Sequence, residues 1–175
     1  MNDMKKIDYI EKIKALDNKL MPIGITPLPK KRSRDPVLNY LKDMYNNPSS
    51  HLVPNLAWIS ILLNAFYTQE RIVLALTKDR MIKLCKNLIP PFNDKSWTDF
   101  VRVCIKSGSF ECSKGTYSGQ PWIFVLTQEV ILEGFKNRNP DIDLEKMRSE
   151  QLAEVKAFVG KAKEIKKPSQ SRNRL

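Results

Sequence analysis

The chain has 175 residues, of which 42% are hydrophobic and 28% are charged. This length predicts one folded domain with extensions, and the composition is too apolar for a disordered chain. Lysine and arginine number 30 against 19 aspartates and glutamates, a net charge of +11, which favours an anionic partner such as nucleic acid or an acidic surface. The single histidine, His51, argues against Ser–His–Asp catalysis and multi-histidine metal sites.

The termini and the cysteines predict a chain without export, membrane or metal chemistry. Residues 1–20 lack the apolar core of a secretory signal, and the longest apolar stretch, residues 56–66, is too short to span a bilayer. Cys85, Cys104 and Cys112 are odd in number and lack C-x-x-C spacing, so we expect reduced thiols, no metal and no cofactor. The expected location is the cytoplasm, in association with the nucleoid. If the host is eukaryotic, the expected location is the nucleus.

Apolar spacing and chain-breaking residues predict the elements in chain order. Apolar residues three and four positions apart indicate helices, short β-branched runs indicate strands, and proline or glycine marks the ends. Thr77 and Thr127 are expected to cap helices, and Ser96 to cap another with Asp99 three residues later. The predicted helices are residues 1–20, 37–45, 54–67, 77–89, 96–107, 128–136 and a last one from 141 or 143 to 165, and the predicted strands are 71–76, 109–113 and 122–126.

The helix over residues 96–107 is predicted to bury one side and to expose the other. Gly108 is expected to end this helix. We expect Trp97 and Trp122 to pack in the interior rather than to stack on bases. The residues expected to be buried, by their i, i+3/i+4, i+7, i+8 spacing, are Trp97, Phe100, Val101, Cys104 and Ile105.

The flanking segments leave alternatives open. Leu152, Val155, Val159 and Ala162 alternate spacings of three and four, which fits either a homodimer through the C-terminal helix or docking on the same chain. The basic cluster at residues 30–34 fits a solvated linker, an arm on phosphates or a nuclear localisation signal. The tail from residue 161 is strongly basic and is predicted to be disordered.

Three helices, a short strand before the second and a hairpin directly after the third occupy about residues 54–126. This pattern resembles the winged helix-turn-helix superfamily, although the link of residues 88–95 is longer than the tight turn of that motif. The resemblance implies a mainly α fold with a small β-hairpin, built as a winged helix-turn-helix core with flanking helices. The expected domains are residues 1–50 (a helix and a basic, proline-rich arm), 51–139 (the winged-helix domain) and 140–175 (a helix and a basic tail).

In that superfamily the third helix enters the major groove and the wing lies along the backbone or the minor groove. The resemblance therefore implies groove reading by Thr98, Asp99 and Arg102, with Asp99 either accepting from a cytosine amine or capping the helix. It also implies that the stretch around Arg102 and the loop around Tyr117 lie side by side. The implied DNA-binding residues are Lys78, Lys95, Thr98, Asp99, Arg102, Lys106, Lys114, Thr116, Tyr117 and Gln120, with phosphate contacts from the four lysines.

The resulting hypothesis is a double-stranded DNA-binding protein that acts in transcription regulation or in replication of a mobile element such as a phage, plasmid or virus. The alternative is a winged-helix adaptor or scaffold between proteins, and RNA is a third possible partner. We expect no enzyme, because the sequence contains neither a P-loop nor a G-x-G-x-x-G motif. The charge surplus is spread along the chain, at +4, +4 and +3 for the three expected domains, so binding requires the fold to gather it on one face.

Overall fold

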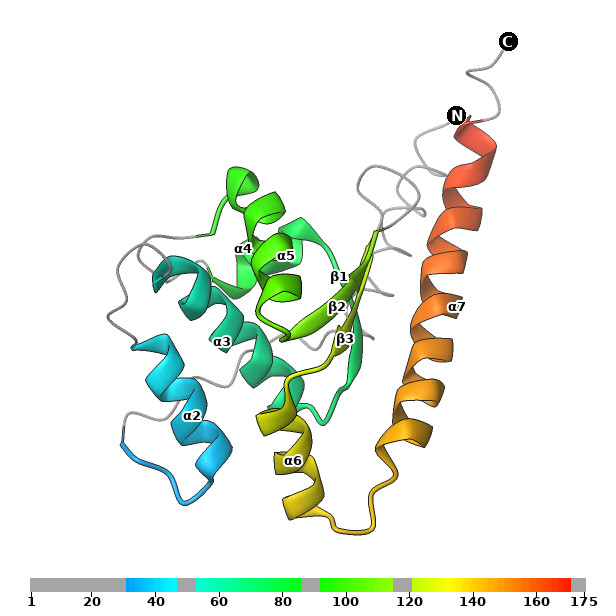
Figure 1. The fold of residues 1–175 in the computed structure, drawn as a ribbon. Coiled ribbons are helices and arrows are strands. Elements are labelled where there is room, and N and C mark those ends of the chain that lie inside the picture. Colours follow the sequence, from blue (N-terminus) through cyan, green and yellow to red (C-terminus); the bar gives the residue numbers. More distant parts are fainter. Residues whose placement is uncertain (1–30, 47–52, 86–91, 115–120, 171–175) are drawn as a thin grey trace.

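The computed structural model describes residues 31–46, 53–85, 92–114 and 121–170, with side chains from residue 56 in the second segment and to residue 159 in the last. This part of the chain is mainly helical and carries a small antiparallel sheet (Figure 1). The helix predicted at residues 1–20 lies outside it. The elements are α2 (Pro36–Tyr45), α3 (Val53–Thr68), β1 (Val73–Leu76), α4 (Lys78–Leu84), the 3-10 helix η1 (Asp94–Ser96), α5 (Trp97–Lys106), β2 (Phe110–Ser113), β3 (Trp122–Leu126), α6 (Glu129–Arg138) and α7 (Leu144–Gln170).

Local capping chemistry explains where several elements begin and end. Asp35 caps α2 by accepting the backbone N–H two residues ahead, at 2.9 Å, and Pro36 occupies the first turn, where its missing N–H costs nothing. Thr77 caps α4 and Asp143 caps α7 by accepting the backbone N–H three residues ahead, at 3.1 and 3.0 Å. Gly108 follows α5 at a positive φ of 72°, a conformation that glycine adopts without strain. The predictions for Thr77 and Gly108 are confirmed, and of the two predicted starts of the last helix, residues 141 and 143, the structure has the second.

Two predicted caps are wrong, because a neighbouring group binds each hydroxyl instead. Ser96 makes no cap bond to α5. It forms a capping box with Asn93 that encloses η1, in which its Oγ accepts the Asn93 N–H at 3.3 Å. Thr127 donates its hydroxyl to the carbonyl of Gly108 at 2.8 Å, and α6 begins after Gln128 without a side-chain cap.

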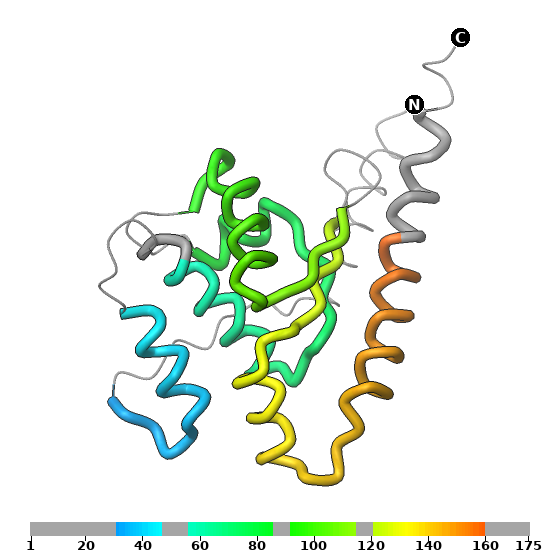
Figure 2. The backbone as a smooth tube through the Cα atoms, in the orientation of Figure 1, coloured from blue at the N-terminus to red at the C-terminus, as the bar shows by residue number. Residues whose placement is uncertain are grey.

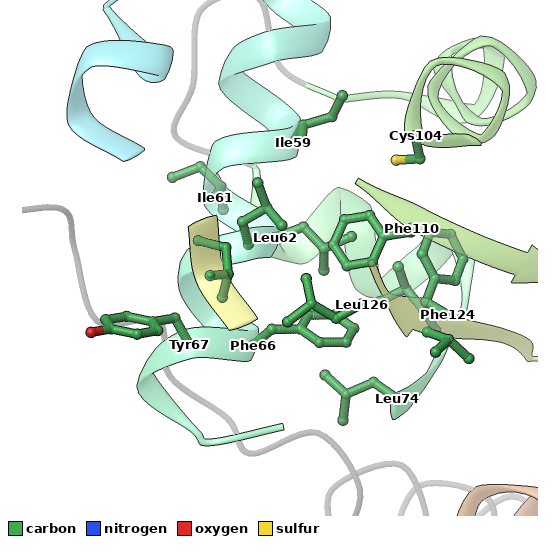
Figure 3. Close-up of a cluster of buried hydrophobic side chains, with 14 of the residues drawn as sticks. Ile59, Ile61, Leu62, Phe66, Tyr67, Leu74, Cys104, Phe110, Phe124 and Leu126 are labelled. Carbon is green, nitrogen blue, oxygen red and sulfur yellow. The ribbon is translucent and has the colours of Figure 1, made fainter. Parts of the chain in front are cut away.

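The sheet has the order β1-β3-β2, with antiparallel neighbours. Leu74 pairs with Phe124 and Phe110 pairs with Leu126, so these side chains share one sheet face. That face lies against α3, where Phe66 stacks 4.9 Å from Phe110 between ring centroids (Figure 3). From Trp58 to Tyr67, α3 is buried without interruption, as expected for a central helix that is largely apolar, although Ser60 and Asn64 are buried with it.

The opposite face of the sheet is covered by α7, which stands across the sheet from α3 and α5 (Figures 1 and 2). Strand residues alternate in direction, so Val73 and Val125 point toward this side. Val155 and Phe158 of α7 are buried here, and both sides of β1 are consequently shielded from water.

Polar contacts at the start of β1 determine the position of α7. The Gln151 side-chain oxygen accepts the backbone N–H groups of Ile72 and Val73, at 2.7 and 3.0 Å. Arg71 forms an ion pair with Glu154 at 3.4 Å. Gln151 thereby satisfies backbone donors that would otherwise be unpaired in a buried setting.

These contacts decide between the alternatives for the C-terminal helix. Leu152, Val155 and Val159 pack on the core of their own chain, so docking on the same chain is confirmed for these three positions. A homodimer through this helix stays a prediction, and it would need a different face. The helix continues to Gln170, beyond the predicted end at residue 165 and into the tail predicted to be disordered, because the four lysines, the alanine and the glutamate from residue 161 to 167 favour helix.

Candidate nucleic-acid interface

Helix α5 carries four of the ten predicted site residues on one exposed face. Phe100, Val101 and Cys104 are buried, which turns the opposite side of the helix outward. Arg102 lies at the centre of that outward face, with its side chain 70% exposed. The other exposed positions of the helix are Thr98, Asp99, Ile105 and Lys106.

An aromatic cluster holds the inner side of α5 against the sheet. The Trp97 ring lies 5.9 Å from Trp122 and 6.0 Å from Phe124, and Phe100 lies 5.4 Å from Phe92. Most of these pairs are edge-on or tilted, the arrangements that aromatic quadrupoles favour. Trp97 and Trp122 therefore serve as packing groups, as predicted, and they give α5 a rigid platform.

Ile105 corrects the predicted buried face, because its side chain is 51% exposed. At about 100° per residue, the positions of Trp97, Phe100, Val101 and Cys104 form a narrow stripe, and Ile105 falls on the edge of that stripe next to Arg102. Neither the sheet nor α3 covers that edge. The apolar spacing predicts one broad buried stripe. In the folded chain the neighbouring elements cover only part of that stripe, and Ile105 lies outside the covered part.

Two weak ion pairs order the charges around α5. Arg102 Nη1 lies 3.5 Å from Asp99 Oδ1 one turn earlier, and both side chains are about two-thirds exposed. Lys78 Nζ lies 3.4 Å from Asp94 Oδ1, which places the N-terminus of α4 next to η1. Exposed pairs of this kind contribute about 0–1 kcal/mol, so a phosphate or a base edge can displace them.

The structure brings some of the predicted residues together and leaves others untested. Lys78 and Lys95 lie near the N-terminal end of α5, because Asp94, which binds Lys78, precedes Lys95 directly. Lys114 is exposed and follows the last residue of β2. Within the described ranges, none of the ion pairs involves Lys95, Lys106 or Lys114. Three predicted site residues, Thr116, Tyr117 and Gln120, lie outside the described residues, and so does the predicted contact between the Tyr117 loop and Arg102.

The cysteines are poor nucleophiles in this fold. Burial raises the pKa of the Cys85 thiol to about 12 and also raises the pKa of Cys104 and Cys112. Because the thiolate is the reactive form, all three remain protonated and unreactive at neutral pH. Among the side chains that the structure describes, no three of the metal-ligating types lie close enough to hold an ion.

A second polar cluster, not anticipated from the sequence, joins α2, α3 and α6. The Tyr67 hydroxyl donates to Asp35 Oδ2 at 2.5 Å, and Arg138 reaches the same oxygen at 3.4 Å. The Arg138 guanidinium stacks 3.8 Å above the Tyr67 ring. We call these three residues the helix staple. Burial, followed by the hydrogen bond to Asp35, raises the pKa of Tyr67, so the hydroxyl keeps its proton and remains a donor.

The helix staple lines a cleft of about 270 Å³ that is open to solvent. Gly134 also lines this cleft, and a Cβ at that position would collide with a methyl carbon of Val37, so glycine allows α6 to approach α2 this closely. In Figure 3 the Tyr67 hydroxyl points away from the Phe66 side of the core. Asp35 and Arg138 are 103 positions apart in the chain, and no local pattern signals their contact.

No family model, no curated protein and no solved structure matches the chain. Within the described ranges, none of the helices combines the length and the hydropathy required to cross a bilayer.

Proposed function

We propose that this chain binds double-stranded DNA through a winged-helix core, in which α5 enters the major groove and the β2–β3 hairpin forms the wing. The order of elements supports this arrangement: α3, β1, α4 and α5 precede the hairpin, and β1 pairs with β3, so strand and hairpin form one sheet. The observation that carries the proposal is the uncovered outer face of α5, which has Arg102 at its centre.

The proposed mechanism divides the residues between phosphates and bases. Lys78, Lys95, Lys106 and Lys114 neutralise phosphates and position the helix, a contribution that falls as salt rises. Arg102 donates two hydrogen bonds to a guanine, Asp99 accepts from a cytosine amine, and Thr98 reads an adjacent edge. Arg102 leaves Asp99 at little cost, because their pair is exposed. The biological role that follows is transcription regulation or replication of a mobile element.

Duplex selection followed by binding measurements tests this division of labour. A preferred site is selected from a random duplex pool with the full chain, and anisotropy is recorded between about 50 and 200 mM salt. We expect Arg102→Ala to reduce the preference at one base pair by roughly tenfold. Lys114→Ala should weaken binding to every duplex and flatten the salt slope by about one unit.

Lys136→Ala is the matched control, because Lys136 is also exposed but lies on α6. It should leave both the sequence preference and the salt slope unchanged. Equal losses on all duplexes for Arg102→Ala and Lys114→Ala would contradict the assigned roles.

A protein–protein adaptor is the second candidate, and Ile105 favours it. An exposed isoleucine on the same outward face as an acidic residue, Asp99, is also suited to a protein surface, where apolar side chains form the centre of an interface. The same measurement separates the two functions. A steep salt dependence on duplex DNA supports the first function, whereas no binding at low salt supports the adaptor.

A further inference from the structure

Two large hydrophobic side chains, Ile105 and Val130, are exposed in the described part of the chain, by 51% and 37%. Single exposed apolar residues are common on soluble proteins, so position rather than exposure carries the argument. Val130 lines the cleft beside the helix staple on α6. Ile105 instead lies on the outer face of α5, adjoining the residue that we propose reads a base.

The geometry of α5 places Ile105 in one row with two polar residues. Thr98, Arg102 and Ile105 are spaced i, i+4 and i+7, so they share one line along the exposed face. With a rise of about 1.5 Å per residue, Ile105 lies roughly 4.5 Å beyond Arg102 along the helix axis. Base pairs stack about 3.4 Å apart, and the two side chains therefore address base pairs that are one or two steps apart.

We infer that Ile105 determines specificity by contacting the 5-methyl group of a thymine, one or two base pairs from the guanine bound by Arg102. This inference rests on the proposed function of α5. An isoleucine side chain has no hydrogen-bonding group, and the thymine methyl is the apolar feature that the major groove presents. The target class is thus duplex DNA with a thymine close to a guanine, and the matching RNA, which has uracil, lacks the methyl group.

Deoxyuridine substitution tests the inference, because it removes this methyl group and leaves the hydrogen-bonding edge of the base intact. The selected duplex is prepared with each thymine replaced in turn by deoxyuridine, and dissociation constants are measured for the full chain. We expect a loss of roughly fourfold at one thymine near the guanine, the value for losing one buried apolar carbon. Ile105→Ala should bind the two duplexes equally well, whereas Val130→Ala, the matched control, should still discriminate between them.

The outcomes separate the two proposals. Selected binding in which every deoxyuridine duplex equals its thymine parent would overturn the inference and leave the proposed function in place. Discrimination that persists in Ile105→Ala would assign the methyl contact to another residue and would also overturn it. If no duplex is selected at all, the proposed function fails and the inference with it. Thermal unfolding by circular dichroism verifies that Ile105→Ala remains folded, as expected for an exposed side chain.

Discussion

Two of the aspartate–arginine pairs in the described residues have nearly equal lengths but differ in their exposure to solvent. Asp99 and Arg102 lie 3.5 Å apart on α5 with side chains 68% and 70% exposed. Asp35 and Arg138 lie 3.4 Å apart in the helix staple with side chains 24% and 38% exposed. The first pair joins residues of one helix turn, and the second joins α2 to α6 through Tyr67.

The comparison teaches that partners, rather than distance, decide what an ion pair does. Asp35 also caps α2 and accepts from Tyr67, so its carboxylate satisfies three separate donors. The contact between Asp99 and Arg102 is exposed to solvent, so water readily replaces it. The helix staple therefore maintains the fold, and the α5 pair is available for exchange with a ligand.

The largest expected effect comes from removing one aspartate of each pair. Asp35→Ala removes the cap of α2 and leaves the Tyr67 hydroxyl without its acceptor, so the free energy of unfolding should fall by about 2–4 kcal/mol. Asp99→Ala should change it by less than about 1 kcal/mol, because the pair is exposed. Urea unfolding of the two variants measures the contrast, and equal losses would contradict it.

A smaller effect is expected at alkaline pH. The pKa of Tyr67 is raised above its ordinary value of 10.0 by burial and by the bond to Asp35. The folded state therefore holds the proton where the unfolded state has lost it. The contribution of the protonated Tyr67 to the free energy of unfolding is therefore fully present below pH 10, and it declines as the pH rises beyond that value.

Tyr67→Phe tests this linkage, because it removes the titrating group and keeps the ring beneath Arg138. The pKa values of the cysteines are also raised by burial, from an ordinary value of 9.0. They therefore lower the free energy of unfolding at high pH by the same amount in wild type and in the variant. We expect the variant to be about 1 kcal/mol less stable at pH 7 and its stability to fall less steeply above pH 10. Parallel curves of unfolding free energy against pH would contradict this linkage, because they would show that Tyr67 has the same pKa in the folded and unfolded states.

The smallest effect is expected for Asp99→Asn, which should leave the free energy of unfolding within about 0.5 kcal/mol of wild type. It releases Arg102 and removes a negative charge from the proposed groove face. Binding to arbitrary duplex DNA should therefore strengthen severalfold, and discrimination at the cytosine assigned to Asp99 should decrease. Weaker binding to arbitrary DNA would show that Asp99 positions Arg102 instead of competing with the phosphates.

Local signals in the sequence were sufficient for the positions of most elements. The Thr77 cap and the Gly108 turn each act within a few residues, and most described helices and strands lie close to the predicted ranges. The exceptions are the ends of α4, which stops at Leu84 instead of residue 89, and of α7, which continues to Gln170 instead of residue 165. The inner face of α5 was also predictable at Phe100, Val101 and Cys104, because apolar spacing depends only on the pitch of one helix.

The partners of these elements depended on the tertiary structure. The spacing of Leu152, Val155 and Val159 is compatible with packing on a second copy of the chain or on the same chain. The strands that these residues cover lie far away in the sequence, so spacing alone does not indicate the contact. Ile105 lies on the edge of a buried stripe whose width is determined by the sheet beside it. The helix staple joins Asp35, Tyr67 and Arg138 from three helices. Residue spacing encodes the shape of one helix or strand, whereas burial and pairing depend on which surfaces the folded chain places against each other.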